Sequence, residues 1–211
     1  MKVYGAILSP MVRKVIVALE MKGLDFELDL VIPFNTPEGF EKISPLKKIP
    51  ALQDGEVTLA DSSIICEYLE DRYPEIALYP TDPAHKAKAR WYEEYADTVL
   101  MKVIAEGLFF ERVVKPMMGM ETDEDKVQQN LKDNMPRTLA YLESVVPEQG
   151  FLLGESLMMA DIGIGSCFIN AGYAGFEPDP SEYPAFAAYL HRVKAHPALQ
   201  KRIKEDAKLL N

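Results

Sequence analysis

A hydroxyl side chain near the start of the chain is a candidate for thiol chemistry. Ser9-Pro10 is suited to open a helix, because Ser favours the N-cap and Pro the first helical position. There the Ser9 hydroxyl could donate a hydrogen bond to an ionised sulfur, and the helix dipole would help to stabilise that charge. Ser9 is therefore the candidate catalytic residue. The alternative is that Ser9 only caps its helix.

A second segment, Lys48-Ile49-Pro50, has the character of a peptide-binding strand. A cis bond before Pro50 would turn the Ile49 N–H and C=O outward, so that an extended peptide could pair with them as an added strand. Lys48, or Lys47 beside it, could meet a carboxylate of that peptide. In the alternative interpretation Pro50 merely begins a strand.

A third segment, Asp61-Ser62-Ser63, lies where a predicted strand meets a predicted helix. The free N–H groups and the dipole of a helix start favour a carboxylate. Ser62 could add a hydrogen bond to it, and the Asp61 carboxylate could pair with an ammonium group of the ligand. A plain N-cap is the simpler interpretation, and both can hold at once. Together the three segments describe a site for a small peptide thiol.

The elements that must position these segments read β-α-β-α-β-β-α. The helical spacing after Ser9 and the stop at Gly23 predict one helix, and Asp54-Gly55 predicts a tight hairpin turn. The crossover predicts a parallel strand pair, and the hairpin adds antiparallel strands. The expected elements are a strand over 2–8, a helix over 10–23, a strand over 26–31, a short helix or irregular turn over 36–43, a hairpin over 51–60 and a helix over 61–72.

The character of the chain changes near Tyr73. The segment that follows, to Pro83, carries three prolines and is typical of a linker. Everything after it is expected to be helical, so the fold class is α/β plus all-α. We expect an N-terminal domain over 1–73, a linker over 74–83 and an all-helical domain over 84–211, with helices over roughly 84–118, 123–146, 159–175, 182–195 and 197–208.

Composition narrows the classes of function. A formal net charge of −10 argues against nucleic acid as a partner, which would require a basic face. No apolar run approaches the length of a membrane span, and no leader pattern precedes the first strand. We therefore expect a cytoplasmic protein without a membrane partner. Cys66 and Cys167 fall within apolar helical patterns, which indicates buried hydrophobic residues, and the histidines show no metal-binding spacing.

Over its whole length the chain resembles the cytosolic glutathione S-transferase family, and its first motif resembles the serine-type classes and suggests a bacterial source. The matching segments are Ser9–Val15, Ser44-Pro45 with Lys47–Leu52, Asp61–Ile65 and Ala160–Ile162. The resemblance implies a thioredoxin-like N-terminal domain, with a cis bond before Pro50. It also implies glutathione as co-substrate and no metal. The implied glutathione-binding residues are Lys48, Ile49, Pro50, Asp61 and Ser62. Tyr4 is the runner-up to Ser9 as the catalytic residue, because tyrosine-type relatives carry their phenol on the first strand.

The resemblance further implies detoxifying transfer of the glutathione thiolate to hydrophobic electrophiles, or peroxide reduction, by a homodimer. The helices around Ile64–Tyr68 and Trp91–Tyr95 would meet the partner. Two alternatives stay open: a non-catalytic, stress- or transcription-associated protein that acts through protein partners, and a glutathione-dependent isomerase. The isomerase is the weaker of the two, since the chain lacks a Ser-Ser-x-Ser-type cluster. Candidate walls of the hydrophobic substrate subsite are Met11, Phe34, Phe109, Phe110 and Tyr173.

Overall fold

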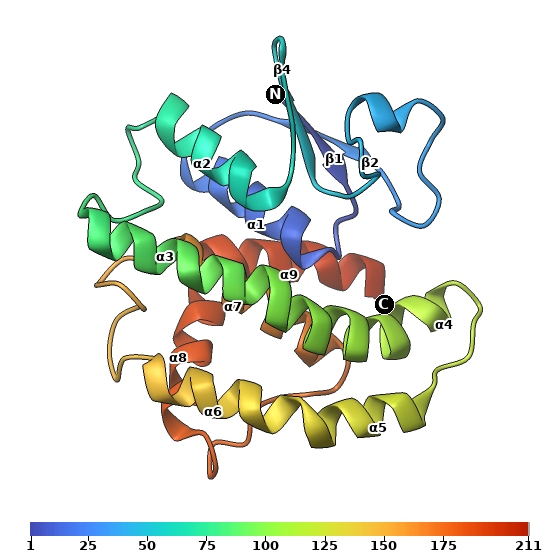
Figure 1. The fold of residues 1–211 in the computed structure, drawn as a ribbon, viewed down its shortest axis with the longest axis vertical. Coiled ribbons are helices and arrows are strands. Elements are labelled where there is room, and N and C mark those ends of the chain that lie inside the picture. The colour runs from blue at the N-terminus through green and yellow to red at the C-terminus, as the bar shows by residue number, and fades with distance from the viewer. Residues whose placement is uncertain (211) are drawn as a thin grey trace. The chain divides into compact units, whose positions relative to one another are not determined.

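A four-stranded β-sheet organises the N-terminal part of the chain in the computed structural model, which describes residues 1–210 (Figure 1). The strands follow the order β2-β1-β3-β4. β1 pairs in parallel with β2, as the predicted crossover requires, and β3 pairs antiparallel with β4, as the predicted hairpin requires. β1 also pairs antiparallel with β3. The strands are β1 (Lys2–Gly5), β2 (Glu27–Leu30), β3 (Ala51–Asp54) and β4 (Val57–Ala60).

The strand register brings three chain segments to one edge of the sheet. Tyr4 in β1 is opposite Ala51 in β3, and Ala51 is opposite Ala60 in β4. Since β3 runs antiparallel to both neighbours, the carboxyl ends of β1 and β4 lie beside the start of β3. The segments that precede α1, β3 and α2 therefore all leave the sheet at this edge, and they are the three segments predicted to form the site.

Two helices of this unit begin at residues whose side chains cap them. Ser9 precedes α1 (Pro10–Met21), and Asp61 precedes α2 (Ser62–Arg72). α1 packs directly on β1, because a Cβ added to Gly5 would lie 2.4 Å from a methyl of Val12. The absence of a side chain at Gly5 thus sets how closely α1 approaches the sheet.

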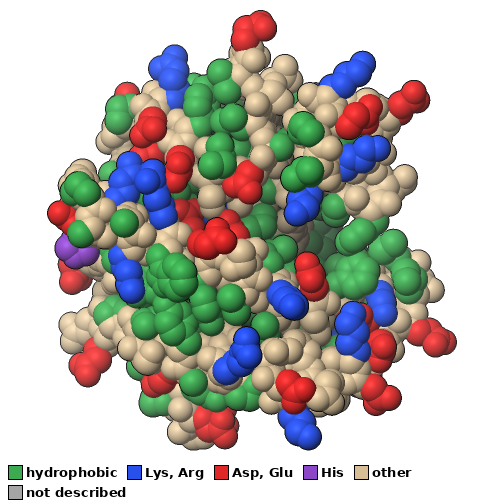
Figure 2. Space-filling view, viewed as in Figure 1, with side chains coloured by type: hydrophobic (Ala, Val, Ile, Leu, Met, Phe, Trp, Pro, Cys, Tyr) green, Lys and Arg blue, Asp and Glu red, His purple; other side chains and the backbone are tan. Residues whose placement is uncertain are grey.

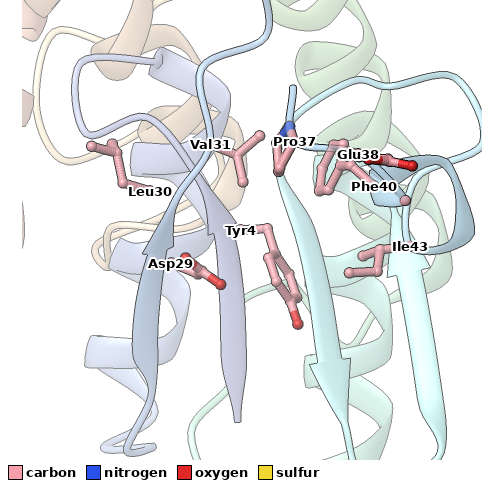
Figure 3. Close-up of a pocket in the computed structure, with 9 residues that line it drawn as sticks. Tyr4, Asp29, Leu30, Val31, Pro37, Glu38, Phe40 and Ile43 are labelled. Carbon is pink, nitrogen blue, oxygen red and sulfur yellow. The ribbon is translucent and has the colours of Figure 1, made fainter. Parts of the chain in front are cut away.

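An apolar cluster covers the face of the sheet opposite α1. Tyr4, Val31, Phe40 and Ala51 are buried together there. Phe40 begins η1 (Phe40–Lys42), a single 3₁₀ turn, which resolves the expected short helix or irregular turn over 36–43. Figure 3 shows the aromatic rings of Tyr4 and Phe40 among the residues that line a pocket on this face.

The C-terminal helix α9 (Pro197–Leu210) packs with the N-terminal unit, which comprises Met1–Pro80 and this helix. The predicted division instead placed 84–211 in the helical domain. Arg13 Nη2 lies 2.6 Å from Asp206 Oδ2, and both side chains are 1% exposed. Because a charge buried without a partner is costly, this pair fixes α9 on α1.

The second unit, Thr81–His196, is helical. The expected helix over 84–118 is a continuous run of three elements, of which η2 has π-type hydrogen bonds: the N–H of Lys115 donates to Phe110 C=O. The expected helix over 123–146 breaks at Asn134. None of the helices within residues 1–210 is long and apolar enough to cross a membrane. The elements are α3 (Pro83–Tyr95), η2 (Ala96–Val114), α4 (Lys115–Met117), α5 (Glu124–Asp133), α6 (Met135–Val145), α7 (Met159–Tyr173) and α8 (Pro184–Ala195).

A buried carboxylate anchors α7, the most buried helix of this unit. Asp161 accepts hydrogen bonds from the N–H groups of Leu152 (2.9 Å) and Met158 (3.0 Å) and from the Tyr189 hydroxyl (2.7 Å). Burial raises the pKa of Asp161, although these hydrogen bonds act against the rise. The N-cap bond forms even though Met158 offers no capping hydroxyl.

Candidate functional site

Ser9 caps α1 and keeps a proton to donate. Its Oγ accepts a long hydrogen bond from Val12 N–H, at 3.4 Å. That bond uses an oxygen lone pair and leaves the hydroxyl proton free to point to another partner. The capping role and the proposed role toward sulfur are therefore compatible at this position.

The runner-up hydroxyl, Tyr4, is engaged elsewhere. It donates to Gln53 Oε1 at 3.0 Å. Its ring is 7% exposed, lies 6.2 Å from the Phe40 ring, and has the Lys2 ammonium 5.3 Å from its centroid. Figure 3 shows Tyr4 within the pocket on the η1 side of the sheet, beside Asp29. These contacts favour Ser9 over Tyr4 as the hydroxyl that meets a thiol.

The Ile49-Pro50 peptide bond is cis, as the resemblance implied. Buried Ser44 orders the segment just before it. Its Oγ donates to Lys48 C=O at 2.8 Å and accepts from Lys48 N–H at 3.1 Å. Ser44 therefore closes the loop that leads into Ile49, while the Lys48 side chain is exposed. Ser44 belongs to one of the matching segments, but no role is predicted for it from the sequence.

Asp61 caps α2 in an unusual backbone conformation. Its φ is 138°, a region that non-glycine residues seldom adopt. One carboxylate oxygen, Oδ1, accepts from the N–H groups of Ser63 (3.0 Å) and Ile64 (3.1 Å). These two bonds do not use Oδ2, and the residue is exposed. Asp61 can thus cap the helix and pair with a ligand ammonium, as the sequence analysis allowed.

Ser62 is 5% exposed and lies between two side chains of α1. Its hydroxyl donates to Met11 Sδ at 3.5 Å and accepts from Lys14 Nζ at 3.4 Å. Lys14, which is fully buried, also donates to Ser63 Oγ at 2.7 Å. Lys14 is not among the site residues predicted from the sequence. A signal existed: Lys14 follows Met11 by three residues, so a lysine falls on the buried face of an apolar helix.

The predicted walls of the hydrophobic subsite differ widely in exposure. Phe34, in the N-terminal unit, is 59% exposed, whereas Met11 is 7% exposed and contacts Ser62. In the helical unit Phe109 is 5% exposed, and Phe110 and Tyr173 are half-buried. The subsite stays a prediction for all five.

The next features are possible metal-binding groups, the two cysteines and the surface charge. Among the described residues there is no group of three or more His, Cys, Asp or Glu side chains that could hold a metal ion. Cys66 and Cys167 are buried and form no disulfide. Acidic and basic side chains are interspersed on the face shown in Figure 2.

Comparisons with known proteins show what the chain is similar to. The family model described as glutathione S-transferase, N-terminal domain, matches residues 3–77, and the corresponding C-terminal domain model matches residues 109–206. A glutathione S-transferase from Hyoscyamus muticus is 33% identical over 171 residues, which cover 77% of this chain and 78% of the relative.

Solved structures give the same result. A glutathione S-transferase from Rhodospirillum rubrum superposes with a TM-score of 0.85 at 28% identity, covering 95% of this chain and 90% of the other. One from Methylobacterium radiotolerans, solved in complex with glutathione sulfonate, gives 0.76 at 26% identity, covering 96% and 93% of the two chains.

Proposed function

Because the chain belongs to the glutathione S-transferase family, we propose that it transfers the glutathione thiolate to hydrophobic electrophiles. The Ile49 backbone pairs with the peptide backbone of glutathione, and the Lys48 ammonium meets its glycine carboxylate. Asp61 takes the γ-glutamyl ammonium, and Ser62 with the first turn of α2 takes the γ-glutamyl carboxylate. Ser9 donates to the sulfur. The observation that supports this assignment is the shared sheet edge, where the segments carrying all five residues leave the strands.

In this reaction the protein lowers the pKa of a thiol and orients two reactants. The Ser9 hydroxyl and the start of α1 stabilise the ionised sulfur, so the thiol proton passes to solvent near neutral pH. The thiolate then forms a carbon–sulfur bond with the electrophile, and a leaving group departs or an activated double bond takes the electron pair. Holding both partners side by side supplies the orientation.

Calorimetry with glutathione tests the binding step, and thermal stabilisation should grow with ligand concentration by mass action. No heat and no thermal shift with millimolar glutathione would overturn the proposal. A panel of halogenated aromatics, enones and peroxides then separates conjugation from peroxide reduction. Glutathione binding without turnover of any of them would instead support the non-catalytic alternative.

The same proposal places the protein in the cytoplasm as a homodimer. Two cysteines that form no disulfide fit a reducing compartment. Ile64 in α2 and Trp91 in α3 are each 51% exposed, in the two helices that the sequence analysis assigned to a dimer contact. A dimer contact through these two helices would bury both side chains.

A further inference from the structure

We infer that Lys14 is a positioning residue of the carboxylate site at the start of α2, where it orients the Ser62 hydroxyl toward the ligand. The inference rests on the proposed function, in which Ser62 meets the γ-glutamyl carboxylate of glutathione. It adds a residue that binds no substrate atom and acts through another side chain.

The Lys14 ammonium group contacts two serine hydroxyls at the start of α2. Lys14 is 0% exposed, and its Nζ lies 2.7 Å from Ser63 Oγ and 3.4 Å from Ser62 Oγ. Ser62 and Ser63 are the first two residues of α2, directly after the capping residue Asp61. One ammonium group of α1 therefore reaches both hydroxyls at the helix start where the carboxylate is expected.

The ammonium group of Lys14 restricts the orientation of these hydroxyls. A lysine ammonium has three N–H donors and no acceptor, so a serine oxygen that contacts it can only accept. The hydroxyl proton of each serine must then point away from Lys14. For Ser62 that proton is directed to Met11 Sδ at 3.5 Å. A thioether is a weak acceptor, so a carboxylate can readily replace it as the partner of the hydroxyl.

Without Lys14, the Ser62 hydroxyl could reverse and present its lone pairs to the ligand, which would repel a carboxylate. With Lys14 in place a lone pair must face its ammonium group, so the hydroxyl proton is kept on the side away from Lys14, where it can donate to the carboxylate. The positive charge also lies at a helix end that already favours anions. We therefore expect Lys14 to matter only for ligands that carry the γ-glutamyl carboxylate.

The test compares two ligands by calorimetry: glutathione and γ-aminobutyryl-cysteinyl-glycine, which lacks only that carboxylate. The dissociation constant of the analogue divided by that of glutathione measures how strongly the protein recognises the carboxylate. In Lys14→Met we expect this ratio to fall about tenfold, the effect of losing one well-oriented hydrogen bond to a charged group. Lys14→Arg should restore most of it, since guanidinium also only donates. Lys14→Gln, which can also accept, should lower it by about threefold and serves if the Met variant does not fold.

Lys22→Met is the matched control. Lys22, the residue that follows α1, is also a buried lysine. It donates to Glu70 Oε2 and to the carbonyls of Tyr73 and Ile76, away from the site. This variant should lower stability and leave the ligand ratio unchanged. Equal weakening of both ligands in Lys14→Met, or the same loss of ratio in Lys22→Met, would overturn the inference and leave the proposed function intact. If the wild-type protein binds neither ligand, the proposed function and this inference both fail.

A double-mutant cycle with Ser62→Ala tests whether Lys14 acts through Ser62. Ser62→Ala alone should lower the ratio, and adding Lys14→Met should then change it little further. If each substitution instead lowers the ratio by its own factor and the two factors multiply in the double variant, Lys14 acts independently of Ser62. That result would contradict the positioning role.

Discussion

At the scale of single residues, the Ser9 hydroxyl both caps α1 and can donate a hydrogen bond to a ligand. The capping bond to Val12 N–H holds the hydroxyl at the start of α1, and its proton remains able to donate. Tyr4, in contrast, already donates to Gln53. The two hydroxyls can therefore be separated by experiment.

We expect Ser9→Ala to lower turnover far more than it weakens glutathione binding. Losing one donor to an anionic group in a partly dry site typically costs about 2–4 kcal/mol in the reaction step. The pKa of the bound thiol, followed by thiolate absorbance against pH, should rise in this variant. Tyr4→Phe is the control and should have little effect. If Tyr4→Phe abolishes the thiolate signal while Ser9→Ala preserves it, the catalytic hydroxyl is Tyr4.

A second residue-scale prediction concerns pH and stability. Glu111, whose side chain is fully buried, lies 2.6 Å from both Lys115 Nζ and Lys126 Nζ. Burial acts to raise its pKa, but the hydrogen bonds from the two lysines outweigh burial and lower the pKa from 4.5 to about 2. A carboxylate with a lowered folded-state pKa stabilises the fold above its unfolded pKa. That contribution is lost as pH falls toward the folded value.

The difference in unfolding free energy between wild type and Glu111→Gln should therefore shrink as pH falls from 4.5 to about 2. Urea unfolding at a series of pH values measures it. Glu121→Gln, at an exposed position nearby, controls for general acid effects. A difference that does not change over this range would show that the ion pairs do not stabilise the fold.

At the scale of elements, the buried pair Arg13–Asp206 attaches α9 to α1, the helix that Ser9 caps. Asp206→Ala should destabilise the N-terminal unit by about 3–5 kcal/mol, because it leaves the Arg13 charge buried without this partner. Urea unfolding measures the loss. The double variant Arg13→Met with Asp206→Leu should recover much of it, since an apolar pair can replace a buried ion pair.

Glu205→Ala is the matched control on the same helix. Its ion pair with Lys208 is exposed, with side chains 43% and 68% accessible. Such pairs contribute about 0–1 kcal/mol, so this change should have little effect on unfolding. An equal loss from both substitutions would mean that helix propensity, and not the buried pair, holds α9.

The loop before β3 gives a second prediction for an element. Ser44 satisfies both backbone groups of Lys48, so Ser44→Ala should loosen the segment that presents Ile49. We expect glutathione affinity to fall about tenfold, the scale of one or two lost hydrogen bonds, while the pKa of the bound thiol stays constant. Calorimetry and thiolate absorbance measure the two effects. Unchanged affinity would show that the loop keeps its conformation without Ser44.

At the scale of the whole molecule, we expect a homodimer with twice the 23.7 kDa mass of the chain. Trp91 is the single tryptophan, it is 51% exposed, and its Nε1 donates to the Tyr141 hydroxyl at 2.9 Å. Its fluorescence should therefore shift to the red when dilution separates the subunits, and light scattering should report the change in mass. A monomer mass at micromolar concentration, without any shift on dilution, contradicts the dimer.

The sequence by itself determined the order of strands and helices in the N-terminal unit and the edge of the sheet to which the candidate site is assigned. Ser9-Pro10, Asp54-Gly55 and Asp61 act on backbone groups a few residues away, so their effects can be predicted from local spacing. The order of strands and helices then left few topologies, and the expected sheet was confirmed.

Only the tertiary structure decided which side chains meet. Arg13 pairs with Asp206, 193 positions away, and Lys14 reaches serines 48 and 49 positions away. Such pairings depend on how helices pack, and no local propensity encodes them. The same reason explains why α9 joins the N-terminal unit, although its sequence continues an all-helical run.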